Sequence, residues 1–198
     1  YAEISYGNFT LDGVAGGWYQ STYTMEQAEQ NTRGYVAEVV QLADPDYDFS
    51  QYDNDGPDNV PNSGDDDGFV DGIIVVYSGC GAEVNEGNNN IWPHQSSLYN
   101  DQYQTNDPSA NGGYVIVNTY AVCPELSGGG DCWTNQIRPI GVYAHEFGHI
   151  LGLPDLYDRD DSSAGIGSWC LMASGSHNGQ MGTTPAHMSV WCKMQLNW

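Results

Sequence analysis

Apolar residues recur every three or four positions between residues 24 and 43, which is the spacing of one face of a helix. Thr24 stands directly before this stripe and Gln27 follows three residues later, so that the two can form a capping box. The pair Asp44-Pro45 ends the pattern, because proline cannot continue a helix. We predict one scaffold helix over residues 24–43 that packs on a sheet. Its apolar stripe comprises Ala28, Val36, Val39, Val40 and Leu42.

Two β-branched stretches predict strands. Residues 72–78 form a continuous apolar run, which is typical of a strand buried on both faces. Residues 114–120 alternate enough for a strand near the edge of a cleft, where an extended peptide could pair with it. The segment between them, residues 79–113, is rich in Gly and Asn and is predicted to be mostly loop.

A third apolar stretch, from Pro139 to Leu151, predicts a helix that carries two histidines and a glutamate. Proline is tolerated in the first turn, where its missing amide would have no partner. His145 and His149 are four residues apart and therefore lie one above the other on one face. Two imidazoles at this spacing can bind one Zn²⁺, and Glu146 can reach a water molecule on the metal. The pattern indicates hydrolysis of an amide bond, with Glu146 as general base and then proton donor.

The residues after this helix supply a candidate third ligand. Gly152 can adopt the positive φ that ends a helix and Pro154 cannot continue one, so the chain turns and brings Asp155 toward the metal. Three protein donors leave a fourth position open, as a catalytic zinc site needs. Tyr157 is either a packing residue or a hydroxyl donor to the oxyanion. Asp158 and its neighbours lie further along and would need a second reversal of the chain, and His177 either points into the cleft or is an exposed loop residue. The remaining candidate donors are Asp158, Asp160, Asp161, His177 and His187.

The same pattern is compatible with a buried helix whose histidines are only hydrogen-bonded core residues. That alternative leaves Glu146 between apolar neighbours without a role. Burying an unpaired charge is costly, so the zinc interpretation is favoured.

These motifs resemble a known group of enzymes. Residues 145–155 resemble the metzincin signature with Asp155 in place of the usual third histidine, and residues 167–175 resemble the Met-turn beneath the zinc of those enzymes. The chain is similar to the immune inhibitor A family of secreted bacterial metalloproteases, peptidase family M6. The resemblance also covers Tyr52-Asp53-Asn54-Asp55-Gly56, Phe69-Val70-Asp71-Gly72 and Thr184-Pro185-Ala186-His187.

The resemblance implies a single α/β (α+β) catalytic domain of the zincin or metzincin type over residues 1–198. Its upper lobe, about 1–151, would hold a twisted mixed sheet and the active-site helix. Its lower lobe, about 152–198, would hold the Met-turn and a C-terminal helix. In such an enzyme His145, His149 and Asp155 hold zinc, and Met172 forms the floor of the site. The implied protein is a secreted, extracellular zinc endopeptidase acting on protein or peptide substrates, whose N-terminal propeptide is absent from this chain.

The last helix is predicted to start at Thr184-Pro185, a cap followed by proline in the first turn. Its inward-facing residues are expected to be Met188, Trp191 and Leu196.

Two other functions stay open. A zinc amidase or deacetylase acting on glycan or peptidoglycan could use the same hydrolytic residues, and a cleft edge that pairs with peptide backbone would speak against it. A catalytically dead, calcium-stabilised binding module is the second alternative. The intact Glu146 argues against that module, since loss of this glutamate is the simplest route to inactivity.

The loop over residues 53–71 is dense in aspartate, and carboxylates at alternate positions near a glycine turn are how a chain wraps Ca²⁺. The M6 family carries a compact Asp-x-Asp-x-Asp-Gly-x-x-Asp pattern, which residues 57–66 interrupt here as an insertion. The resemblance therefore implies that Asp53 and Asp55 join Asp67 and Asp71 across the loop. A solvated acidic loop is the alternative, but so much unneutralised like charge would repel itself.

The charge is lopsided, with 26 acidic residues against 4 basic ones and a formal net charge of −22. Such a surface repels nucleic acid and anionic membranes. No run of 18 apolar residues is present, so we expect no membrane-spanning helix. A chain of 198 residues that is 39% hydrophobic fits one domain or one domain in two lobes. Because it begins at Tyr1 without a signal peptide, we interpret it as a trimmed catalytic domain.

The five cysteines contain no Cys-x-x-Cys metal knuckle, which favours disulfide bonds in a secreted protein. Cys123 and Cys132 bracket a short Gly-rich loop and are the first predicted pair. Cys170 and Cys192 are the second, which leaves Cys80 free.

Overall fold

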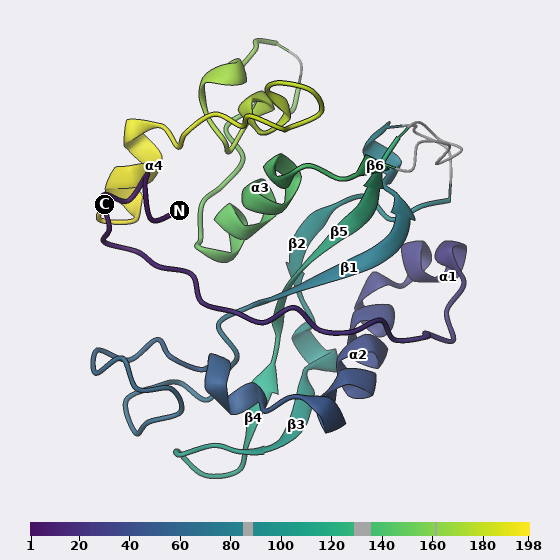
Figure 1. The fold of residues 1–198 in the computed structure, drawn as a ribbon, viewed down its shortest axis with the longest axis vertical. Coiled ribbons are helices and arrows are strands. Elements are labelled where there is room, and N and C mark those ends of the chain that lie inside the picture. Colours follow the sequence, from purple (N-terminus) through teal and green to yellow (C-terminus); the bar gives the residue numbers. More distant parts are fainter. Residues whose placement is uncertain (85–88, 129–135, 161) are drawn as a thin grey trace.

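A computed structural model describes residues 1–84, 89–128, 136–160 and 162–198. A mixed sheet lies at its centre, as predicted, and Figure 1 shows helix α3 on one side of it and the helices α1 and α2 on the other. The strand order is β1-β5-β2, with β6 paired to β5. A separate sheet consists of β3 and β4. The strands span Ile73–Cys80 (β1), His94–Ser97 (β2), Tyr103–Pro108 (β3), Tyr114–Val117 (β4), Thr119–Ser127 (β5) and Gln136–Ile137 (β6).

Residues 114–120 form strand structure as predicted, but not as one strand at a cleft edge. The stretch forms two strands, β4 and β5, that separate at Asn118, whose main chain and side chain accept the amides of Leu98 and Tyr99. β5 is the central strand, parallel to β1 and antiparallel to β2. The edge beside helix α3 belongs to β2, which arises from a segment predicted to be loop. Its sequence, His-Gln-Ser-Ser, is too short and too polar to show a strand pattern.

β1 is buried on one face only, contrary to the prediction. Val75 and Tyr77 are 7% and 2% exposed and belong to the main core with Val36 and Val40 of α2. The alternate residues of β1 are much more open: Ile74 is 38% exposed and Val76 39%. Helix α3 packs against β5 and β2, so it leaves the β1 part of that face open to solvent.

The predicted scaffold helix is two helices, α1 (Met25–Gln30) and α2 (Thr32–Ala43). The capping box of Thr24 and Gln27 is present. The helix breaks at Asn31, whose side chain accepts the amide of Gly34 and so caps α2. None of the helices in the described part of the chain is long and apolar enough to cross a membrane.

Helix α3 (Ile140–Ile150) agrees with the prediction, although Pro139 is its N-cap and not a residue of its first turn. The last helix, α4 (Val190–Gln195), starts later than predicted, with Ser189 and not Thr184 as its N-cap. Met188 is buried, but Trp191 is 45% exposed and Cys192 takes its place in the core. Short 3₁₀ turns span Asp44–Asp46, Phe49–Tyr52, Ala82–Val84, Tyr99–Asp101, Gly167–Trp169 and Ser174–His177.

The predicted cysteine pairs were wrong. Cys123 is a buried free thiol, and its proposed partner Cys132 lies outside the described residues. Cys170 and Cys192 are also free, with their sulfur atoms 3.7 Å apart in the core under α4. Cys80, predicted free, is disulfide-bonded. Pairing depends on the tertiary distance between thiols, which spacing along the chain did not reveal.

Candidate metal centre and active site

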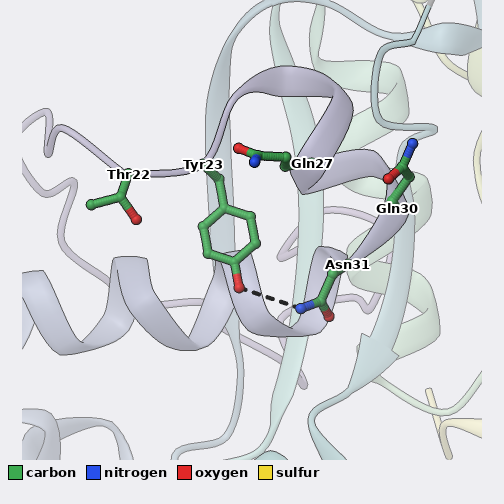
Figure 2. Close-up of a pocket in the computed structure, with 5 residues that line it drawn as sticks. All are labelled: Thr22, Tyr23, Gln27, Gln30 and Asn31. Atoms are coloured by element: carbon green, nitrogen blue, oxygen red, sulfur yellow. Dashed lines mark hydrogen bonds between the residues drawn. The ribbon is translucent and has the colours of Figure 1, made fainter.

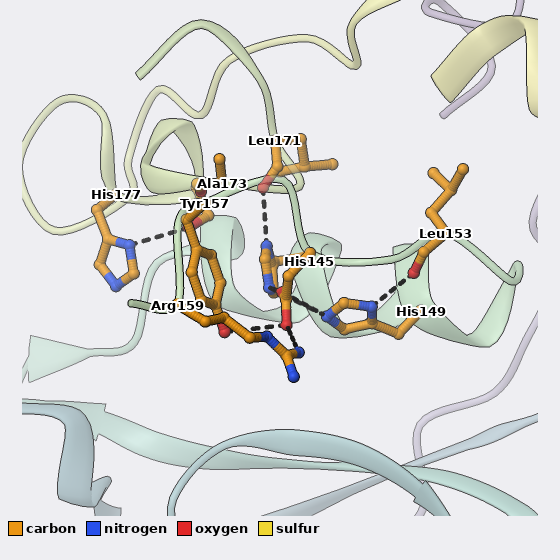
Figure 3. Close-up of polar contacts among 10 residues, drawn as sticks. His145, His149, Leu153, Tyr157, Arg159, Leu171, Ala173 and His177 are labelled. Atoms are coloured by element: carbon orange, nitrogen blue, oxygen red, sulfur yellow. Dashed lines mark hydrogen bonds and ion pairs between the residues drawn. The ribbon is translucent and has the colours of Figure 1, made fainter. Parts of the chain in front are cut away.

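The two histidine rings of α3 are each held by a backbone carbonyl. His145 Nδ1 lies 2.8 Å from the carbonyl oxygen of Leu171, and His149 Nδ1 lies 2.7 Å from that of Leu153 (Figure 3). A carbonyl oxygen only accepts hydrogen bonds, so each Nδ1 carries its hydrogen. The Nε2 atoms of the neutral rings are therefore left with free lone pairs, which is the form that coordinates a metal.

Asp155 meets these two nitrogen atoms after the turn at Gly152, which has φ +89° as the sequence predicted. Asp155 Oδ1 lies 3.2 Å from His145 Nε2 and 3.1 Å from His149 Nε2. The two Nε2 atoms are 3.2 Å apart. Tetrahedral zinc with bonds of about 2.0–2.1 Å places its ligand atoms roughly 3.3 Å from one another. The three donors thus form a triangle of the size that zinc requires.

The chemistry of this donor set also fits a cation. Two nitrogen lone pairs and a carboxylate oxygen converge on one point, and none of these atoms carries a hydrogen to offer the others when the imidazoles are neutral. Burial opposes the ionisation of Asp155, but its close contacts with the two histidines, Arg159 and Tyr157 outweigh burial and hold the pKa of that carboxyl below its usual range. A divalent cation would satisfy all three donors.

Glu146 lies beside this triangle and is 6% exposed. Burial raises the pKa of its carboxyl, against the opposing effect of His145 and His149. The backbone amide of Gln95, in strand β2, donates a hydrogen bond to it. A raised pKa makes a carboxylate a better proton acceptor near neutral pH, so the position suits general base chemistry.

Met172 lies below α3, where the resemblance to the Met-turn put it. It is fully buried, and a Cβ atom added to Gly148 would overlap its sulfur atom. Gly148 therefore allows α3 to approach this residue closely. The backbone carbonyl of Met172 also accepts the amide of Leu156 at 2.7 Å, which ties the segment after Asp155 to the same residue.

Two residues missed by the sequence reasoning contact the other carboxylate oxygen of Asp155. Oδ2 accepts a hydrogen bond of 2.9 Å from the hydroxyl of Tyr157 and one of 2.5 Å from Nη2 of Arg159. Tyr157 was considered as a rival oxygen donor, a packing residue or an oxyanion donor, but not as a partner of Asp155, and Arg159 had no assigned role. An arginine four residues after the third ligand was the available signal.

The rival donors do not join this triangle. Asp158 accepts the amides of Asp160 and Ser163, and His177 Nδ1 lies 2.9 Å from the hydroxyl of Ser176. His187 is exposed, and Asp161 lies outside the described residues. Within the described residues, the group of donor atoms around α3 contains only His145, His149 and Asp155.

A second group of donors lies in the acidic loop. Asp53, Asp55 and Asp67 offer carboxylate oxygens within 4.8 Å of one another. Asp53 is 1% exposed, and its Oδ1 has no hydrogen-bond partner in the described part of the chain. Burial, followed by the nearby charge of Asp66, raises the pKa of Asp53 to about 6. Asp71, predicted as a fourth ligand, is not a member of this group, and its Oδ1 instead accepts the amide of Asn54 at 3.4 Å.

A shallow hollow beside α1 has a volume of about 410 Å³ (Figure 2). Within it, the side-chain amide of Asn31 donates to the hydroxyl of Tyr23 at 3.3 Å. Its lining contains no His, Cys, Asp or Glu, so it offers neither a metal ligand nor a carboxylate base. The lining residues are Thr22, Tyr23, Gln27, Gln30 and Asn31.

The whole chain is similar to one kind of peptidase domain. The family described as immune inhibitor A peptidase M6, catalytic domain, matches residues 1–197. Pre-pro-metalloprotease PrtV of Vibrio cholerae serotype O1 (strain M66-2) is 30% identical over 222 residues, which cover 99% of this chain and 23% of the relative. Immune inhibitor A of Bacillus thuringiensis subsp. alesti is 30% identical over 220 residues, which cover 96% of this chain and 30% of the relative. The chain therefore spans less than a third of the length of these two relatives.

Proposed function

Because the chain belongs to the immune inhibitor A family of M6 peptidases, we propose that it is the catalytic domain of a secreted zinc-dependent endopeptidase. The observation that carries this proposal is the triangle of donor atoms from His145, His149 and Asp155, with edges of 3.1–3.2 Å, beside the buried Glu146. Its substrates are peptide bonds of extracellular proteins.

Each residue of the site has a separate proposed role. His145, His149 and Asp155 hold the metal, and the carbonyls of Leu171 and Leu153 keep both rings turned toward it. Zinc bound there would polarise the peptide carbonyl and lower the pKa of a water molecule toward neutrality. With zinc in place, the Glu146 carboxylate would act as the general base that takes a proton from the attacking water and as the acid that returns it to the leaving amine nitrogen.

Strand β2 supports a peptide substrate over a glycan. β2 pairs with β5 on one side only among the described strands, and it lies beside α3. Its free edge can therefore take an extended peptide as an additional strand next to the metal centre. An amidase or deacetylase acting on sugars has no use for such a backbone-pairing edge.

We also propose a structural calcium ion in the acidic loop. The supporting observation is Asp53, a buried carboxylate that forms one group with Asp55 and Asp67 and whose Oδ1 has no hydrogen-bond partner among the described residues. A buried unpaired charge needs a counter-ion, and a donor set made only of oxygen atoms suits Ca²⁺ and not Zn²⁺. The calcium would pin the loop that leads into β1.

The relatives support an extracellular protein made with a propeptide. One of them is named a pre-pro-metalloprotease, and this chain matches only a part of its length. We propose that the chain likewise acts outside the cell after a separate propeptide has been removed.

The test is the metal content of the purified protein together with its activity on casein before and after chelation. We expect about one zinc per chain, loss of casein hydrolysis with a zinc chelator and recovery on adding Zn²⁺. Full activity in the metal-stripped protein would refute the proposal. A matched assay on peptidoglycan and acetylated chitooligosaccharide separates the peptidase from the amidase or deacetylase.

A further inference from the structure

The two carboxylate oxygens of Asp155 face different partners. Oδ1 lies 3.2 Å and 3.1 Å from the Nε2 atoms of His145 and His149, whereas Oδ2 accepts hydrogen bonds from Tyr157 and Arg159. The Asp155 side chain is 9% exposed, but that of Arg159 is 75% exposed. The arginine thus reaches in from solvent and places a charged donor 2.5 Å from a nearly buried oxygen.

The Asp155 side chain needs these hydrogen bonds to fix its orientation, because the residue lies in neither a helix nor a strand. It follows the end of α3 in a segment without helix or strand, whereas His145 and His149 stand on the rigid helix. A carboxylate on such a segment can rotate and offer a metal one oxygen or two. With Oδ2 occupied by two donors, only Oδ1 remains available to the metal.

We propose that Arg159, assisted by Tyr157, is a positioning residue that fixes Asp155 as a ligand through one oxygen. The proposal rests on the zinc site proposed above. It gives Arg159 a function in metal binding although its side chain never touches the metal. It also makes the metal affinity depend on an exposed residue of a surface loop.

The sign of the effect separates positioning from simple electrostatics. A positive charge near a cation site opposes metal binding, so an arginine that acts only through its charge would weaken the site, and its removal would tighten metal binding. An arginine that positions the ligand has the opposite effect, because its removal frees the carboxylate. Loss of an outer partner of a metal ligand typically costs about 10–100-fold in metal affinity.

The experiment measures the Zn²⁺ dissociation constant by competition with a chromophoric chelator, and the visible spectrum of the Co²⁺-loaded protein. We expect Arg159→Gln to weaken Zn²⁺ binding about 10–100-fold and to lower the intensity of the Co²⁺ bands, because a second carboxylate oxygen raises the coordination number. Arg159→Lys keeps the charge without the planar fork and should fall between the wild type and the glutamine variant. Tyr157→Phe removes the neutral donor and should have a smaller effect in the same direction.

Arg33→Gln is the matched control. It removes the same charge from a residue of α2 that stacks over the ring of Tyr99, 4.5 Å from its centroid, away from the metal centre. Its Zn²⁺ affinity and Co²⁺ spectrum should equal those of the wild type.

Zn²⁺ affinity in Arg159→Gln that is equal to or tighter than the wild type, with an unchanged Co²⁺ spectrum, would overturn the positioning role. Asp155→Ala distinguishes this failure from failure of the zinc site itself. If Asp155→Ala loses the metal while Arg159→Gln keeps it, the site stands and only the role of Arg159 falls. If Asp155→Ala binds zinc like the wild type, the zinc site assigned here is wrong. If the melting curve shows that Arg159→Gln does not fold, Tyr157→Phe is measured instead, and unchanged Zn²⁺ affinity in that variant would overturn the positioning role.

Discussion

The two groups of convergent donors differ in where their support comes from. Around α3, the ring of His145 is held by the carbonyl of Leu171, which is 26 residues away, and the floor is Met172. In the acidic loop the carboxylates accept amides of the same loop: Asp55 Oδ1 accepts the amide of Asp67 at 3.2 Å, and Asp67 Oδ1 that of Phe69 at 2.8 Å. The group around α3 thus has a long-range contact at His145 besides its local ones, whereas the carboxylates of the other group bond within one segment.

This difference matches the work proposed for each group. A catalytic metal must keep an open position and a fixed geometry, which suits two histidine ligands that are held in advance by the rigid helix α3. A structural cation can gather flexible carboxylates, because oxygen ligands of Ca²⁺ tolerate irregular geometry. Glu146, the proposed base, stands beside the first group only, so we assign the proposed chemistry to the metal centre and the proposed stabilising role to the loop.

The largest effect should come from removing the base. Glu146→Ala should lower casein hydrolysis by about 10²–10⁴-fold, because the proton of the attacking water then has no acceptor. Zinc content and the melting temperature should stay close to those of the wild type, since the three metal donors are untouched. A variant that digests casein at a near wild-type rate would show that the base lies elsewhere.

The next largest effect should come from the third ligand. Asp155→Ala should lose zinc on dialysis, as measured by metal analysis, and activity should fall with it. Asp155→His restores a nitrogen donor and should retain more metal than the alanine variant. Asp158→Ala is the matched control, because the Asp158 carboxylate accepts amides of its own loop, those of Asp160 and Ser163, and lies outside the group of metal donors. This variant should keep its zinc.

The sequence predicted the parts of the metal centre that depend on local spacing. His145 and His149 follow from the helical period, and Asp155 from the turn at Gly152, and the structure brings all three together. Their role as zinc ligands stays a prediction. Arg159 was missed because its contact with Asp155 depends on the path of a loop, for which no periodicity exists.

The strands show the same limit. The apolar run of β1 was found, but one of its faces is exposed because α3 packs on β5 and β2, and the run itself does not encode where that helix lies. β2 was missed because four polar residues on a sheet edge look like loop. The strand that borders the site is thus the one with the weakest sequence signal.

The third prediction concerns calcium and the stability of the loop. Adding Ca²⁺ to the metal-stripped protein should raise its melting temperature, because a ligand that binds only the folded state stabilises it. At 100 times the dissociation constant the gain is about 2.7 kcal/mol, or roughly 5–10 °C for a chain of this size. The measurement is a melting curve with Ca²⁺ against one with a calcium chelator and Mg²⁺. If calcium does not change the melting temperature, the loop binds no structural calcium and is a solvated acidic segment.

The calcium effect should also grow with pH. The pKa of Asp53 is raised to about 6 by burial, so the metal-free fold favours the protonated carboxyl. Its contribution to stability is complete below the usual pKa of about 4 and is lost as the pH rises through 6. Calcium binds the ionised form, so it competes with the proton. The rise in melting temperature with Ca²⁺ should therefore be larger at pH 7.5 than at pH 5, and an equal rise at both would contradict the role of Asp53.

The smallest effect tests which aspartates form the loop site. Asp67 lies in the convergent group with Asp53 and Asp55, whereas Asp71 does not. Asparagine keeps the oxygen that accepts the amide of Phe69 in one case and of Asn54 in the other, so each substitution mainly removes a charge. Asp67→Asn should weaken calcium binding about tenfold, which removes about 1.4 kcal/mol of the stabilisation at a fixed calcium concentration. Asp71→Asn should change stability by less than about 0.5 kcal/mol, as an exposed residue outside the site does. Equal losses from both would restore Asp71 as the fourth ligand and show that the loop closes further around calcium than its metal-free arrangement suggests.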